Sequence, residues 1–160
     1  MDPMFSLLEV HKLMFFQREA GEPLRLNYEK AAYGPYADNL RHVFNRLEGH
    51  YIIGYQDGGD APDKQIDLVS GAVQKAQEAL KDSPQTQQRM KRVKSLVEGF
   101  ETPYGLELLS TVYCVAKNEQ AQNLEQIIQQ VHAWNERKQA FTPKQIGIAY
   151  QLLKEQKWLG

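Results

Sequence analysis

The chain has 160 residues, of which 42% are hydrophobic and 10% aromatic. This composition fits one globular domain, residues 1–160, that buries a core without disulfides. Its 19 basic and 20 acidic residues give a net charge of −1, which excludes the broad positive field of a strong duplex binder. We find neither a membrane-spanning apolar run nor a signal peptide, so we expect a cytoplasmic protein that does not bind membranes.

The first predicted helix begins at Asp2 and Pro3, runs to about Ala20 and stops at Gly21. Its apolar residues cover most of the helix circumference, which is typical of a central helix. Residues 24–30 then alternate between apolar and polar side chains, which predicts a short strand before a Tyr-Gly-Pro-Tyr corner.

A second helix is predicted over residues 35–48, with Pro35 in its first turn and Gly49 after its end. Helical spacing places five apolar side chains on one buried stripe: Tyr36, Leu40, Val43, Phe44 and Leu47. The opposite side is free to meet a partner and presents Asn39, Arg41, His42, Asn45 and Arg46.

Residues 50–55 predict a half-buried strand in which Tyr51, Ile53 and Tyr55 face one side. Turn-forming residues fill positions 56–64, and positions 65–69 alternate again. This pattern indicates a long hairpin, or wing.

The rest of the chain is predicted to be helical, with helices that begin near Ala72, Ser83, Thr102, Asn123 and Thr142. The Ser83 helix is expected to bury Met90, Val93, Leu96, Val97 and Phe100. Thr142 and Gln145 have capping-box spacing around Pro143. We therefore predict an α+β, mostly helical, winged-helix-like fold with six or seven helices and a small antiparallel sheet.

Catalytic and metal-binding motifs are missing from the sequence, which predicts that the chain is not an enzyme and needs no cofactor or metal. The four histidines lack ligand spacing, and we expect the single cysteine, Cys114, to be a small core residue.

The partner-binding candidates are the exposed side of the second helix and the corner beside it: Tyr33, Tyr36, Asn39, Arg41, His42 and Arg46. The two tyrosines are equally consistent with plugging the core. Asp57 and Asp60 are interpreted first as turn formers and alternatively as an acidic prong for a basic groove. The basic stretch 89–94 is interpreted as a solvated face, with phosphate binding as the alternative.

The segments HKLMFF, GEPLR and YGPYADNLRHVFNRLEGH, followed by LVEGFETPYGLELLSTV, closely resemble the C-terminal domain of DarG antitoxins of DarT–DarG toxin–antitoxin systems. The resemblance covers most of the chain. The K-L-x-x-F and Y-G-P patterns are more distantly similar to the SocA-like Panacea antitoxin domains.

This resemblance implies that the chain binds and neutralises a DarT-like toxin, an NAD-dependent DNA ADP-ribosyltransferase, by covering its substrate groove. It also implies that the chain is excised from a longer antitoxin whose macrodomain is absent here. Nucleic acid is not required for this role. The alternatives are a winged-helix-like nucleic-acid-binding module and a scaffold that oligomerises the antitoxin, and the oligomeric state stays open.

Overall fold

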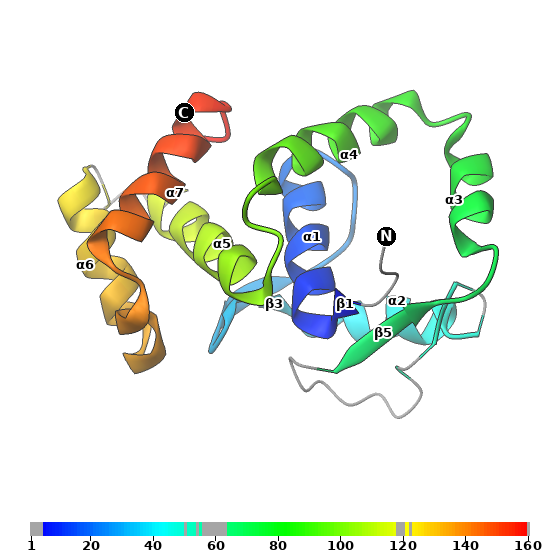
Figure 1. Cartoon of the computed structure of the whole chain (residues 1–160), viewed down its shortest axis with the longest axis horizontal. Coiled ribbons are helices and arrows are strands. Elements are labelled where there is room, and N and C mark those ends of the chain that lie inside the picture. Colours follow the sequence, from blue (N-terminus) through cyan, green and yellow to red (C-terminus); the bar gives the residue numbers. More distant parts are fainter. Residues whose placement is uncertain are drawn as a thin grey trace.

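The computed structural model describes residues 5–49, 51–53, 55, 64–117, 121 and 123–159 (Figure 1). These residues form seven α-helices, one 3₁₀ helix and five short strands, which confirms the α+β, mostly helical class. In chain order they are β1 Phe5–Ser6, α1 Leu7–Glu19, β2 Tyr28–Ala31, β3 Gly34–Ala37, α2 Leu40–Leu47, β4 Ile52–Ile53, β5 Gln65–Leu68, α3 Ala72–Leu80, α4 Pro84–Val97, α5 Pro103–Lys117, α6 Leu124–Trp134, η1 Glu136–Ala140 and α7 Pro143–Glu155.

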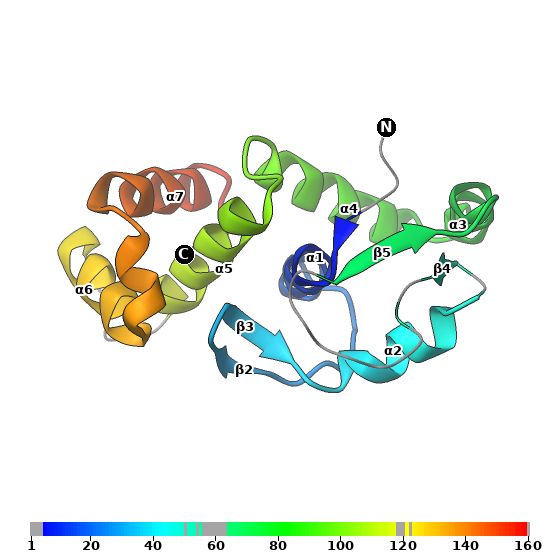
Figure 2. The same ribbon diagram turned by 60° about the horizontal axis from the view of Figure 1, so that its bottom comes forward.

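Helix α1 lies in the middle of the molecule, as its apolar circumference predicts (Figures 1 and 2). Its residues Phe15 and Phe16 belong to the main core, together with apolar side chains of α4, α5, α6 and α7. Its first residue, Leu7, joins a second core with Leu40 and Phe44 of α2 and Ile66 of β5. One helix therefore connects two apolar clusters, with α5, α6 and α7 on one side and α2, α3 and β5 on the other.

The start of α1 differs from the prediction. Ser6 is the N-cap and forms a reciprocal capping box with Glu9, while Asp2 and Pro3 lie outside the described residues. The helix begins only at Leu7 because residues 5 and 6 pair with β5 as an antiparallel strand. Its predicted end is confirmed, since α1 stops at Glu19 and Gly21 adopts a φ of +113°.

The predicted helix start at Pro35 is wrong, because Pro35 lies in strand β3. This strand pairs antiparallel with β2, and Ala31 opposite Gly34 leaves a two-residue turn between the strands. A proline is compatible with the edge of such a small sheet. The strand predicted over 24–30 is correspondingly shifted to β2, and the following helix, α2, begins at Leu40.

The remaining strands form a three-stranded antiparallel sheet in the order β1-β5-β4. Strand β5 matches the prediction closely, whereas β4 contains only two residues and buries Ile52, which was expected to point away from the core. Gly49, with a φ of +83°, confirms the predicted left-handed end of α2. Positions 56–63 of the predicted wing lie outside the described residues.

The helices after residue 70 begin almost where the sequence predicts. Asn123 accepts a hydrogen bond from the backbone N–H of Gln126 at 2.9 Å, and Thr142 and Gln145 form the predicted capping box. One buried position is wrong: the Met90 side chain is 46% exposed on α4.

No helix in the described part of the chain combines the length and apolar character needed to cross a bilayer.

Gly34→Ala tests the packing of the β2–β3 turn. An added Cβ at Gly34 would lie 3.0 Å from Thr111 Oγ1 and 3.3 Å from Ser110 Oγ, at a φ of +107°. We expect a loss of unfolding free energy of about 2 kcal/mol or more in urea denaturation. Gly99→Ala, also at positive φ but with no atom within 4 Å, isolates the backbone strain. An equal loss in both variants would contradict the packing argument.

Candidate partner-binding surface

A groove beside α2 contains three of the predicted binding residues. It has a cavity volume of about 430 Å³ and is lined by Met14 of α1, residues 24–26, Asn39, His42, Val43 and Arg46. We call this the α2 groove. His42 and Arg46 are exposed, whereas the apolar residues Met14, Leu24 and Val43 are half-buried. The groove therefore combines an apolar floor with polar sides.

Asn39 holds the extended segment 24–27 against the start of α2. Its side-chain oxygen accepts a hydrogen bond from the backbone N–H of Asn27 at 3.1 Å, and its side-chain nitrogen donates to the carbonyl of Arg25 at 2.7 Å. The Asn39 side chain makes no capping bond to α2. Asn39 therefore shapes the α2 groove by fixing one of its walls.

The α2 groove is electropositive. Arg25 and Arg46 are exposed and form no ion pair within the described part of the chain. Arg41 differs, because its guanidinium lies 3.4 Å from the Asp38 carboxylate. Two arginines that form no ion pair with the described residues favour a negatively charged partner group.

The two tyrosines of the corner are separated by the hairpin. Tyr36 stacks on the buried His11 ring with centroids 4.6 Å apart. Tyr33 lies on the other side, with the Arg137 guanidinium 4.4 Å from its ring centroid. Both side chains are half-buried, and neither lines the α2 groove. Their binding role stays a prediction. Asp57 and Asp60 lie outside the described residues.

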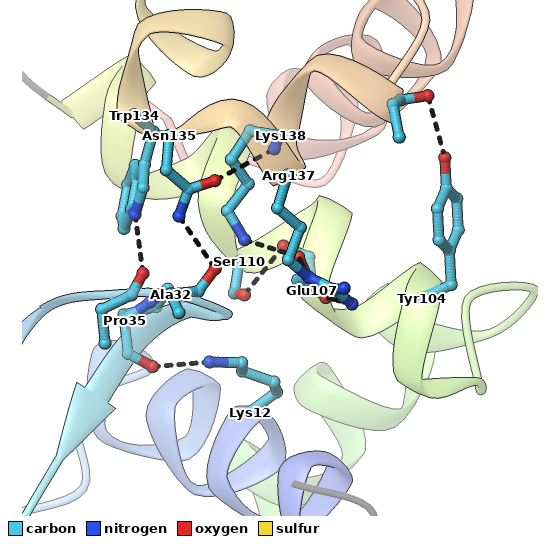
Figure 3. A network of polar contacts seen from close by, with 12 residues as sticks. Lys12, Ala32, Pro35, Tyr104, Glu107, Ser110, Trp134, Asn135, Arg137 and Lys138 are labelled. Carbon is cyan, nitrogen blue, oxygen red and sulfur yellow. Dashed lines mark hydrogen bonds and ion pairs between the residues drawn. The ribbon is translucent and has the colours of Figure 1, made fainter.

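A buried polar network fixes the hairpin beside this surface (Figure 3). The Glu107 carboxylate of α5, only 2% exposed, accepts hydrogen bonds from Lys138 Nζ at 2.5 Å and from Arg137 at 2.9 and 3.1 Å. Lys138 is fully buried. This ion pair fastens η1 to α5.

Hydrogen-bond donors from helix α1 and from the end of α6 hold the β2–β3 hairpin in place. Trp134 and Asn135 donate to the carbonyls of Ala31 and Ala32 at 2.7 and 3.1 Å, and Lys12 Nζ of α1 donates to the carbonyl of Pro35 at 2.7 Å. None of these residues is among the functional candidates predicted from the sequence. Of the residues in this network, only Glu107 could have been recognised from the sequence, because it is a single charged residue within the apolar run 106–109.

The basic stretch on α4 is partly committed to internal contacts. Arg89 lies 3.3 Å from the Glu22 carboxylate, and the Arg92 guanidinium lies 4.1 Å from the ring centroid of Trp158. Lys91 and Lys94 remain exposed on the solvent side. The stretch is thus only in part the solvated face that the sequence predicts.

Cys114 packs against the main core, and burial raises its pKa to about 12. Its thiol is therefore protonated at neutral pH, which disfavours a nucleophilic role. Within the described residues, no group of three or more His, Cys, Asp or Glu side chains is arranged to hold a metal ion.

The described residues thus define an α+β, mostly helical protein with an apolar, positively charged groove. No family model matches the chain. It is 40% identical over 146 residues to the protein named DNA ADP-ribosyl glycohydrolase from Thermus aquaticus, a match that covers 91% of this chain and 40% of the relative. The proteins of the same name from Mycobacterium bovis and Mycobacterium tuberculosis are 33% identical over 154 residues, covering 90% of this chain and 43% of each relative.

The chain is related to DNA ADP-ribosyl glycohydrolases over nine tenths of its own length, and it spans about two fifths of the length of these relatives. This relation supports the predicted link to DarG proteins. It corrects the prediction that the chain is not an enzyme, because the relatives that match it are named for an enzyme activity. The prediction rested on the absence of short catalytic motifs and of a macrodomain pattern in this sequence, and the names of the relatives overturn it.

Replacing Glu107 tests the buried ion pair. In Glu107→Gln the fully buried Lys138 loses its carboxylate partner, and we expect a loss of about 3–5 kcal/mol in urea denaturation. The double variant Glu107→Leu/Lys138→Met removes both charges and should recover much of this loss. Glu125→Gln, on the exposed surface of α6, is the matched control. A loss below 1 kcal/mol in Glu107→Gln would contradict the assignment.

Lys12 makes stability depend on pH. Burial, and then the charge of Lys138, lower the pKa of Lys12 to about 7 against the partial opposing effect of Glu107. The unfolded chain, with a lysine pKa of 10.5, binds more protons above pH 7, so stability rises with pH. We expect a gain of about 2 kcal/mol between pH 6.5 and 8.5.

Urea denaturation across this range checks the prediction. Lys12→Met should flatten the dependence of unfolding free energy on pH, whereas Lys91→Met, which changes an exposed lysine, should leave the slope as in the wild type. Burial also lowers the pKa of Lys138, so a small slope should persist in Lys12→Met. Equal slopes in wild type and Lys12→Met would show that Lys12 stays charged when buried.

Proposed function

We propose that this chain is the part of a DarG-like protein that binds and neutralises a DarT-like toxin, a DNA ADP-ribosyltransferase. The observation that supports it most is the relation to DNA ADP-ribosyl glycohydrolases across nine tenths of the chain. An enzyme that removes ADP-ribose from DNA and a toxin that adds it act on the same modification. The resemblance of residues 33–50 to DarG antitoxins is the reason that we name a DarT-like toxin as the partner.

We propose that the α2 groove is a contact surface for the toxin. Its half-buried apolar floor offers area for burial, and its exposed guanidinium groups, Arg25 and Arg46, offer charge-assisted hydrogen bonds to carboxylates. Binding of this surface would exclude substrate sterically, because a folded chain of this size covers an adjoining groove once it is docked. Asp57 and Asp60 remain proposed as a second, acidic contact.

The name of the relatives adds an enzyme class to the proposal. A DNA ADP-ribosyl glycohydrolase hydrolyses the glycosidic bond between ADP-ribose and DNA: water supplies the hydroxyl group to the sugar, and the DNA group that leaves takes the proton. We infer that the chain works in a protein with this activity. Neutralisation by contact would act on the toxin, while hydrolysis would reverse the damage that escaped it.

Charge reversal in the α2 groove tests the contact. In Arg25→Glu/Arg46→Glu, both exposed guanidinium groups become carboxylates, and we expect the dissociation constant for the toxin to increase at least tenfold, which is about 1.4 kcal/mol. Isothermal titration calorimetry measures this change, and growth of cells that co-express toxin and variant measures neutralisation. Lys81→Glu/Lys144→Glu, with both lysines exposed, is the matched control.

Unchanged affinity in Arg25→Glu/Arg46→Glu, with full rescue of growth, would remove the α2 groove from the proposal. A chain that forms no complex with the toxin at all would refute the antitoxin role itself.

A nucleic-acid-binding module is a second candidate. One observation favours it: the exposed arginines of the α2 groove form no ion pair with any residue that the structure describes. The internal contacts of Arg89 and Arg92 on α4 count against it. Such a module would retard DNA in a gel without toxin and lose the shift as salt is raised. No shift at low salt excludes this candidate.

A further inference from the structure

A second groove adjoins the α2 groove and is almost entirely apolar. It lies between α1 and α4, has a cavity volume of about 550 Å³ and shares Met14 and Leu24 with the α2 groove. Its other apolar residues are Leu13 of α1 and Met90, Val93 and Val97 of α4. We call it the α1–α4 groove.

Two large apolar side chains that line this groove are exposed to solvent. Leu13 is 37% and Met90 is 46% exposed, and both line the same hollow. An exposed apolar residue alone needs no explanation, but a contiguous apolar hollow is characteristic of a binding site. Burial of both side chains by an occupant would be favourable, since apolar area removed from water stabilises a complex.

The walls of the groove favour a helical occupant. Both walls are α-helices, whose backbone N–H and C=O groups are already bonded within each helix. They offer no free backbone groups to an extended strand, which would leave its own polar backbone unpaired on an apolar surface. An amphipathic helix satisfies its own backbone and presents apolar side chains at i, i+3, i+4 and i+7 to such a groove.

The charges around the groove favour an acidic occupant. At one end the Glu22 carboxylate is fully engaged by Gln17, Thr86 and Arg89, with distances of 2.9, 2.9 and 3.3 Å. At the rim, Lys94 is exposed and forms no ion pair among the residues described. The adjoining α2 groove adds Arg25 and Arg46, which are likewise unpaired. The charge left to a partner is therefore positive.

We infer that the α1–α4 groove binds an amphipathic helix of the toxin, with apolar residues over Leu13 and Met90 and carboxylates opposite Lys94 and the α2-groove arginines. This inference rests on the proposed function for the identity of the partner. It adds a second, apolar contact to the charged contact at the α2 groove. The affinity is thus expected to depend mainly on the apolar groove, and the association rate mainly on the cations.

Met90→Glu tests the apolar contact. Because the side chain is 46% exposed, the variant should fold like the wild type, as its thermal unfolding will show. We expect its dissociation constant for the purified toxin to rise at least tenfold in calorimetry. Val73→Glu, at a side chain 43% exposed on helix α3 and outside the lining of the groove, is the matched control and should bind like the wild type.

Lys94→Glu tests the charge of the occupant without changing an apolar contact. It should weaken toxin binding severalfold at low salt, whereas Lys91→Glu, on the same helix and outside the groove, should not. Hydrogen exchange of the complex should then show protection of α1 and α4 together with an acidic helix of the toxin.

The outcomes separate the two proposals. Toxin binding that Met90→Glu leaves unchanged, or that Lys94→Glu strengthens, overturns the groove inference while the antitoxin role stands. Met90→Glu that only converts a dimer of this chain to a monomer in sedimentation also overturns it, because a second copy is then the occupant. Absence of any complex with wild-type chain refutes the antitoxin role, and the groove inference with it.

Discussion

The structure depends on one buried carboxylate. Glu107 of α5 lies where water cannot solvate it, and a buried charge is tolerated only with a partner, so Lys138 and Arg137 of η1 must stay against it. This contact fixes the end of α6, where Trp134 and the C-cap residue Asn135 donate hydrogen bonds to the turn of the hairpin. Since β3 leads within three residues into α2, the position of the α2 groove follows from an ion pair on the opposite side of the hairpin.

Most helices could be predicted because their signals are local. The capping oxygens of Asn123 and Thr142 accept the expected backbone hydrogen bonds, and these bonds involve residues only three positions apart. Pro35 was misplaced for the opposite reason. A proline with φ near −65° suits both the first turn of a helix and an edge strand, and the contact that distinguishes them, Lys12 Nζ to the Pro35 carbonyl, comes from 23 residues away.

The candidate surface could be predicted only in part. Helical spacing correctly placed His42 and Arg46 on one exposed side of α2, because periodicity determines which side chains share a face. It could not indicate that Met14 and Leu24 complete the groove, since they come from other segments. Nor could it identify the exposure of Met90: its position on α4 continues the buried stripe, but in the structure its side chain lines a hollow between α1 and α4.

The two grooves together explain why the surface near α1 combines features that stability alone disfavours. Exposure of the apolar Leu13 and Met90 to water is unfavourable, and Lys94, Arg25 and Arg46 form no ion pair within the described part of the chain. In contrast, the polar side chains at one end of the hollow bind one another: Gln17, Thr86 and Arg89 all donate hydrogen bonds to the Glu22 carboxylate. Among the described residues that line the two grooves, the side chains left without an internal partner are therefore mainly apolar or cationic. A partner that supplies apolar side chains and carboxylates on one helix answers both needs in a single contact.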